Sequence, residues 1–215
     1  MVGAATVSGL RERKKQQTRD ALIASAQRLF AAQGYEGTTT GQIAEAVDVS
    51  QRTLFRYFAN KDEVALAPLD EAQDSFAAAL RARPRRETPM TAMRAAMGSV
   101  FSGYADDESG PRRLRALGQT FDLIVRTPSL HATHLRRVAD REAQIAAIVA
   151  EREGVDPVAD PRPRLAAAVF DAALQVASTC QRNEPGELDP RALYAELERT
   201  LDALPGIFGH WRRTT

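Results

Sequence analysis

The chain has 215 residues, of which 44% are hydrophobic and 27% charged, and its formal net charge is +1. This length is enough to bury a core in one or two domains. No apolar stretch reaches the roughly 18 residues of a membrane span, and the first ten residues lack the pattern of a signal peptide. Cys180 is the only cysteine, which excludes an intramolecular disulfide.

The chain opens with a basic run, RERKK at residues 11–15. Such a run is most often a solvated tail, but beside a nucleic-acid-binding domain it is also a candidate arm for phosphates or the minor groove. We assign residues 1–15 to a flexible basic arm. Residues 18–33 follow as an amphipathic helix, because apolar side chains recur at helical spacing and Gly34 provides a stop.

Two short helices joined by a tight turn are predicted next. Thr39 and Gln42 have the spacing of a capping box, which starts the first of them. Asp48 occupies the turn, where a left-handed backbone is often required. Ser50 is a good cap for the second helix, residues 51–58.

This second helix separates apolar from basic side chains. Leu54 and Phe58 are four residues apart and share one face, while Arg52 and Arg56 project from nearly the opposite face. Arginine suits bidentate contact with guanine O6 and N7. Taken alone, the pattern is most often a solvated surface. After a helix and a turn of this kind, it indicates a helix-turn-helix that places its second helix in the major groove of DNA.

The segment resembles the DNA-binding domain of the TetR (tetracycline repressor) family of bacterial regulators over residues 16–65. The resemblance rests on a Thr-rich helix start, an Ile-Ala pair, the turn and the second helix: Thr38, Thr39, Ile43, Ala44, Val49, Ser50, Thr53, Leu54, Phe55, Tyr57, Phe58 and Lys61. Three departures from the family pattern are Asp48 for glycine, Phe55 for a common tyrosine and Gly41 for a polar residue. These departures affect which operator sequence the domain is expected to recognise.

The resemblance implies a helix-turn-helix domain over residues 16–61 and an all-helical ligand-binding and dimerisation domain over residues 62–210. The predicted DNA contacts are Thr39, Thr40, Gln42, Gln51, Arg52, Thr53, Phe55, Arg56, Tyr57 and Lys61. Charge follows the same division, because residues 1–61 hold nine basic and five acidic residues, a net +4, which leaves −3 for the remainder. A basic domain joined to a mildly acidic one suits a protein that binds DNA through the first.

The remainder reads as further helices, and no run alternates convincingly as a strand, so we predict an all-α chain. The expected helices are 62–83, interrupted or kinked near Pro68, then 90–104, 112–126, 129–153, 163–182 and 189–203.

The last two of these helices are the candidate dimer interface. Residues 164–180 are rich in alanine, which allows close helix approach, and leucine recurs along the final helix. Ordinary core explains such a stripe equally well; the family resemblance favours a four-helix bundle formed by two copies. A dimer would present two recognition helices about 34–36 Å apart to a palindrome. The residues assigned to the interface are Ala172, Val176, Leu193, Leu197 and Leu201.

A ligand site is predicted from a stripe of methionine and aromatic side chains in residues 90–104 and from the helices that follow. Plain core is again the competing explanation of a stripe that would also suit a small apolar or amphipathic molecule. The candidate residues are Met93, Met97, Phe101, Leu117, Phe121, His131, His134, Phe170 and Leu174. The two histidines have no third ligand at suitable spacing, so we expect no metal and no cofactor.

An enzyme is disfavoured because the sequence has no phosphate loop, nucleophile elbow, dinucleotide fingerprint or Cys–His arrangement. The prediction is a homodimeric, ligand-responsive DNA-binding regulator of the cytoplasm, and on family grounds a repressor. The alternative is a ligand-independent or architectural DNA-binding protein, which would have no use for so large a body. Cys180, near Val176 and Ala177, is predicted to be a buried, inert thiol, with redox sensing as the alternative.

Overall fold

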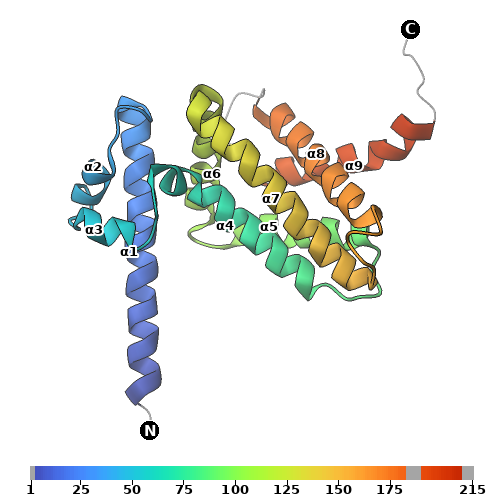
Figure 1. The fold of residues 1–215 in the computed structure, drawn as a ribbon, viewed down its shortest axis with the longest axis horizontal. Helices are drawn as coiled ribbons and strands as arrows, with labels where there is room; N and C mark the ends of the chain where they lie inside the picture. Colours follow the sequence, from blue (N-terminus) through green and yellow to red (C-terminus); the bar gives the residue numbers. More distant parts are fainter. Residues whose placement is uncertain (1–2, 183–189, 210–215) are drawn as a thin grey trace. The chain divides into compact units, whose positions relative to one another are not determined.

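The computed structural model describes residues 3–182 and 190–209, and these residues form helices with no strand among them (Figure 1). The helices are α1 Gly3–Gln33, α2 Thr40–Glu45, α3 Gln51–Phe55, α4 Lys61–Ala82, α5 Pro89–Asp106, α6 Gly110–Arg126, α7 Pro128–Glu153, α8 Arg162–Arg182 and α9 Pro190–Gly209. The all-α prediction is confirmed. None of the described helices is long and apolar enough to cross a membrane.

The chain divides into two compact units, and neither is a continuous stretch of sequence. The first, here called the head unit, combines Met1–Asp70 with Gln119–His134. The second, the body unit, combines Glu71–Gly118 with the chain from Leu135 onward. The head unit therefore includes the end of α6 and the start of α7, which the sequence assigned to the second domain.

The first helix starts earlier than expected. It begins at Gly3, so the basic residues that we assigned to a flexible arm lie on a helix. From Leu10 to Gln33 the chain has no glycine or proline and many straight-chain helix formers, which explains the continuation. Gly34, with φ +77°, ends α1, and its N–H donates to the Phe30 carbonyl at 3.0 Å.

The fourth helix is not interrupted at proline. It runs from Lys61 to Ala82 with Pro68 inside it. Its start is capped reciprocally, since the Glu63 N–H donates to Asn60 Oδ1 at 2.9 Å and Glu63 Oε2 accepts from the Ala59 N–H at 2.7 Å.

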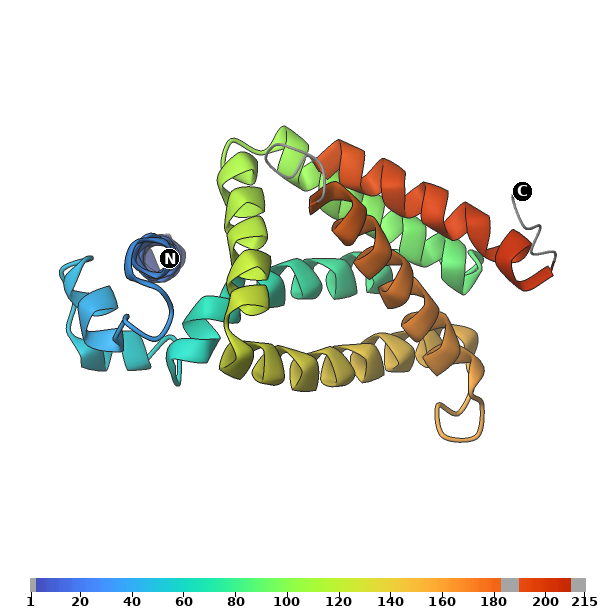
Figure 2. The same cartoon turned by 90° about the horizontal axis from the view of Figure 1, so that it is seen from above.

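In the body unit, α9 packs against α5 and α8, as both ribbon views show (Figures 1 and 2). Arg94 on α5 makes ion pairs with Glu198 at 3.1 Å and Asp202 at 2.6 Å on α9. The buried Arg152 guanidinium on α7 donates to the carbonyls of Leu80, Arg83 and Pro84 at 2.7–3.2 Å, which satisfies the C-terminal end of α4.

Candidate functional site

The first short helix is fixed by its own cap. The Thr39 hydroxyl accepts from the Gln42 N–H at 3.2 Å, and Gln42 Oε1 accepts from the Thr39 N–H at 2.9 Å. The predicted capping box is therefore confirmed. The Gln33 side-chain amide on α1 also donates to Gln42 Oε1 at 3.2 Å, so any DNA contact by Thr39 or Gln42 is made alongside a structural role.

The turn between α2 and α3 adopts the strained conformation expected of it. Asp48 has a φ of +54°, the left-handed region that glycine adopts at no steric cost. The Val49 N–H then donates to the Ala44 carbonyl at 3.1 Å. A short polar side chain tolerates this backbone better than a branched one, which explains why aspartate serves here.

The recognition helix α3 is shorter than predicted. Ser50 caps it by accepting from the Thr53 N–H at 3.1 Å, and regular helix ends at Phe55. Two further bonds, from the N–H groups of Tyr57 and Phe58 to the Leu54 carbonyl, at 2.9 and 3.0 Å, continue the turn. Leu54 and Phe58 are buried as predicted.

The outward face of this turn carries the candidate base-reading residues. Arg52 and Arg56 are exposed, and Phe55 is 47% exposed. The Arg56 guanidinium lies 5.3 Å from the centre of the Tyr57 ring and donates to its hydroxyl at 3.4 Å. This stacking restricts Arg56 before any DNA arrives.

A direct bond connects the exposed sides of the two short helices. The Gln51 side-chain amide on α3 donates to the Thr40 hydroxyl on α2 at 2.8 Å. The structure thus brings Thr40 and Gln51 together, while the Thr53 hydroxyl is hydrogen-bonded to the Ser50 hydroxyl at 2.9 Å.

Lys61, predicted to bind a phosphate, is engaged within the head unit. Its ammonium donates to the carbonyls of Tyr35 and Thr38 at 2.8 and 3.0 Å and lies 4.1 Å from the centre of the Tyr35 ring. The Tyr35 hydroxyl donates to Asp62, and burial, reinforced by that carboxylate, raises the pKa of Tyr35. The hydrogen bond of this phenol to Asp62 connects the loop after α1 to the start of α4.

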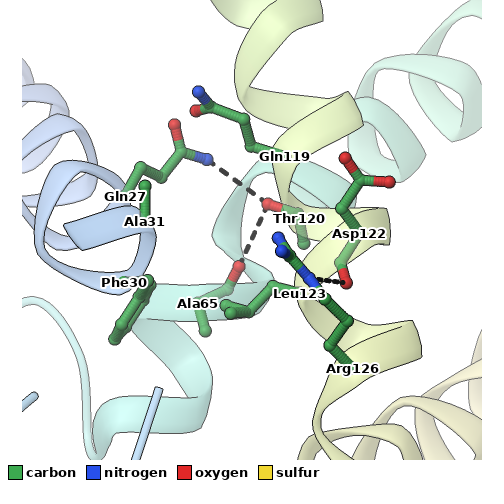
Figure 3. A pocket seen from close by; sticks show the side chains of 9 residues that line it. All are labelled: Gln27, Phe30, Ala31, Ala65, Gln119, Thr120, Asp122, Leu123 and Arg126. Atoms are coloured by element: carbon green, nitrogen blue, oxygen red, sulfur yellow. Dashed lines mark hydrogen bonds between the residues drawn. The ribbon is translucent and has the colours of Figure 1, made fainter. Parts of the chain in front are cut away.

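A polar junction in the head unit was missed by the sequence analysis. Figure 3 shows the Thr120 hydroxyl of α6 between the Gln27 amide of α1 and the Ala65 carbonyl of α4, each at 3.3 Å. Thr120 is almost fully buried. The small cavity beside it, about 50 Å³, is far below the roughly 300 Å³ of a typical ligand pocket. The only signal in the sequence was a threonine among the apolar positions of a predicted helix.

The candidate ligand residues are divided between the two units. Met93, Met97, Phe101, Leu117, Phe170 and Leu174 belong to the body unit, whereas Phe121, His131 and His134 belong to the head unit. None of the nine lines the small cavity described above. Among the described residues no group of three His, Cys, Asp or Glu side chains is placed to hold a metal.

The stripe of the body unit is core in this structure. Met93 is 0% exposed, and Met97, Phe101 and Phe170 are also buried. Phe170 stacks on Phe76 with ring centres 5.4 Å apart. In the head unit His131 is exposed, and the rings of Phe121 and His134 meet edge-on at 6.5 Å.

The residues predicted to form the dimer interface fall into a buried group on α9 and an exposed group on α8. Leu193, Leu197 and Leu201 are 4%, 0% and 3% exposed within the single chain, so these three side chains belong to the core of the protomer and expose little surface to a second copy. They pack inside the body unit because α9 turns this stripe toward its neighbours α5 and α8.

On α8, in contrast, an apolar face is exposed to solvent. Ala172 and Val176 are exposed, and Leu165, about two turns before Ala172 on the same side, is 65% exposed. Cys180, one turn beyond Val176, is exposed as well, which corrects the prediction of a buried thiol.

Two family models match consecutive stretches of this chain. The family model described as "Bacterial regulatory proteins, tetR family" matches residues 22–67, and the model described as "MftR C-terminal domain" matches residues 87–206. HTH-type transcriptional regulator TcmR of Streptomyces glaucescens is 45% identical over 210 residues, covering 95% of this chain and 91% of TcmR. MftR of Mycobacterium tuberculosis is 31% identical over 133 residues, covering 59% and 61% of the two chains.

Solved structures show the same fold. SmeT, described as the repressor of the Stenotrophomonas maltophilia multidrug efflux pump SmeDEF, has been solved in complex with triclosan. That complex aligns with a TM-score of 0.57 at 23% identity, covering 87% of this chain and 91% of SmeT.

Proposed function

Because this chain belongs to the TetR family of bacterial transcriptional regulators, we propose that it is a dimeric repressor that binds a palindromic operator. A small apolar or amphipathic molecule, bound in the body unit, releases it from the DNA. The contacts with bases come from α3 and those with phosphates from the residues around it.

This proposal rests on the two faces of α3, one buried and apolar, the other exposed and basic. Leu54 is fully buried while Arg52 and Arg56 are exposed on the other side, with Arg56 restrained by Tyr57. A restrained guanidinium on an exposed helix suits bidentate contact with guanine in the major groove. The Gln51 amide and the Thr40 hydroxyl, which are hydrogen-bonded to each other, supply groups for further contacts.

Selection from random duplex DNA tests the proposal. The wild-type chain should enrich a palindrome, and the variant Arg52→Ala/Arg56→Ala should enrich none, although it keeps its helical content and thermal stability. A wild-type protein that enriches no sequence above the starting pool would refute operator binding.

The dimer is proposed to form through the open apolar face of α8, made of Leu165, Ala172 and Val176, with the exposed side of α9 completing a bundle of four helices. Two copies are needed because one short recognition helix offers too few contacts for tight, specific binding. Two recognition helices one DNA turn apart would read both halves of a palindrome.

The class of effector is proposed from the body stripe and from a relative. Met93 and Met97 are adaptable side chains that can repack around an apolar molecule, and SmeT has been solved with triclosan, an amphipathic aromatic compound. Triclosan is therefore the first probe, followed by a panel of amphipathic aromatics, with operator release as the readout. Operator DNA should weaken effector binding by the same factor by which the effector weakens operator binding.

The burial of this stripe favours a second candidate function, ligand-independent DNA binding. A packed core at Met93, Met97 and Phe170 needs no effector to explain it. The two candidates differ in the response of Met97→Trp, which should shift release by an effector in the first and affect only stability in the second.

A further inference from the structure

The first helix carries its basic residues in a row. Arg11, Lys15 and Arg19 are four residues apart, so at about 100° per residue they lie along one side of α1. Leu22 and Ala26, both fully buried, continue the same line. The side of α1 that packs into the head unit therefore changes from apolar to basic as the helix extends toward its N-terminus.

The row begins next to the recognition helix. The Arg19 guanidinium lies 5.2 Å from the centre of the Phe58 ring, and Phe58 belongs to the turn that continues α3. Beyond this contact α1 runs past α2 and α3, as Figure 1 shows. With a rise of 1.5 Å per residue, Arg11 lies about 12 Å along the axis from Arg19.

Arg11 and Lys15 of this row are exposed to solvent. Lys15 pairs with Glu12 at 3.4 Å, but both side chains are well exposed, at 65% and 74%, so the pair is weak. Arg11 is exposed, as are Arg13 and Lys14. Arg13, two residues from Arg11, projects from the opposite side of the helix.

Such a row fits a polyanion with regularly spaced charges. Duplex DNA is the polyanion that the head unit is proposed to bind, and it carries one negative charge per about 1.7 Å of helix axis. We propose that Arg11 and Lys15 bind the phosphate backbone that flanks the bases read by α3, so that α1 is a rigid second DNA-contacting element. This inference rests on the proposed operator binding and adds a contact that a flexible arm would not make.

The test is the salt dependence of operator affinity for the full-length chain. The slope of log K against log salt is negative, and Arg11→Gln should lower its magnitude by about 0.9 for each protomer that contacts the operator. Arg13→Gln is the matched control, since it removes the same charge two residues away on the opposite side. A smaller change for Arg13→Gln is expected, whereas equal changes for the two variants would overturn the proposal.

A second variant tests the rigidity of the row. One alanine inserted between Gln16 and Gln17 keeps every charge but rotates the preceding segment by about 100°. Glu12 then takes the place of Arg11, and Gln16 that of Lys15. The insertion should lower the slope as far as Arg11→Gln/Lys15→Gln does, whereas an unchanged slope would show that residues 3–16 act as a flexible arm.

The outcomes also separate this inference from the one on which it rests. If the wild-type chain selects no operator, the proposed function fails. If it selects one, and Arg11→Gln and the insertion both bind it with the wild-type slope, only the phosphate-binding row is refuted.

Discussion

The head unit and the body unit place their candidate functional residues in opposite environments. In the head, Arg52 and Arg56 are exposed, and the buried Leu54 and Phe58 behind them form only a scaffold. In the body, the residues proposed to meet an effector, Met93 and its neighbours, are themselves the core. Substitutions should therefore separate function from stability in the head, whereas in the body the two should change together.

The largest effect is expected in the body. Met93→Ala removes a fully buried side chain and should lower the free energy of unfolding by about 2–5 kcal/mol. Urea unfolding followed by circular dichroism measures this. A loss below about 1 kcal/mol would show that the stripe repacks easily, as a ligand site does, and would weaken the contrast between the units.

The exposed face of α8 should behave unlike the core beneath it. Val176→Glu places a charge at the centre of the proposed dimer interface and should weaken dimerisation by about 2 kcal/mol or more without unfolding the protomer. Sedimentation velocity and operator binding should show the same loss. Val158→Glu is the control, because Val158 is 92% exposed and lies outside α8; a monomer that still binds a full palindrome tightly would contradict the coupling.

In the head, function should be lost without stability. Arg56→Ala should weaken operator binding by about 1–3 kcal/mol and relax the preference at one base of each half-site, with an unchanged melting temperature. Arg28→Ala, an exposed arginine on α1, is the control for charge alone. An equal loss of affinity for operator and random DNA would make Arg56 a phosphate contact.

Lys61 is the head residue at which a substitution is expected to change both stability and DNA binding. Lys61→Met removes the two hydrogen bonds to Tyr35 and Thr38 and should lower stability by about 1–2 kcal/mol, discounted for partial exposure. Its proposed phosphate contact is measured separately, by the salt slope of operator binding, which should fall by about one unit for each protomer. A reduced stability with an unchanged slope would leave Lys61 a purely structural residue.

Much of the head was predictable because its determinants are local. The cap of Thr39 and Gln42, the left-handed Asp48 and the inward Leu54 each depend on residues within four positions. The bond of Thr120 to Gln27 joins residues 93 positions apart, and no local pattern indicates such a pair.

In the body, periodicity revealed which residues share a face but not what covers that face. Leu193, Leu197 and Leu201 form the predicted stripe, yet it packs within the protomer. The same ambiguity explains Cys180, whose apolar neighbours indicated burial although the thiol is exposed. The bonds of Lys61 to the Tyr35 and Thr38 carbonyls were not predictable for a different reason, because a flexible four-carbon stem reaches backbone carbonyls as readily as solvent.

The discontinuity of the head unit has a consequence for protein engineering. A graft of the first 70 residues onto another regulator would lose three hydroxyl groups. Thr120 is hydrogen-bonded to α1 and α4. Ser129 donates a hydrogen bond to Glu36 at 3.0 Å, and Thr133 donates one to Asp62 at 2.9 Å. The transferable module consists of two segments, up to Asp70 and Gln119–His134. A chimera that keeps the operator specificity of this chain therefore has to carry both, or recruit a host whose sixth and seventh helices offer hydroxyl groups at the same three places.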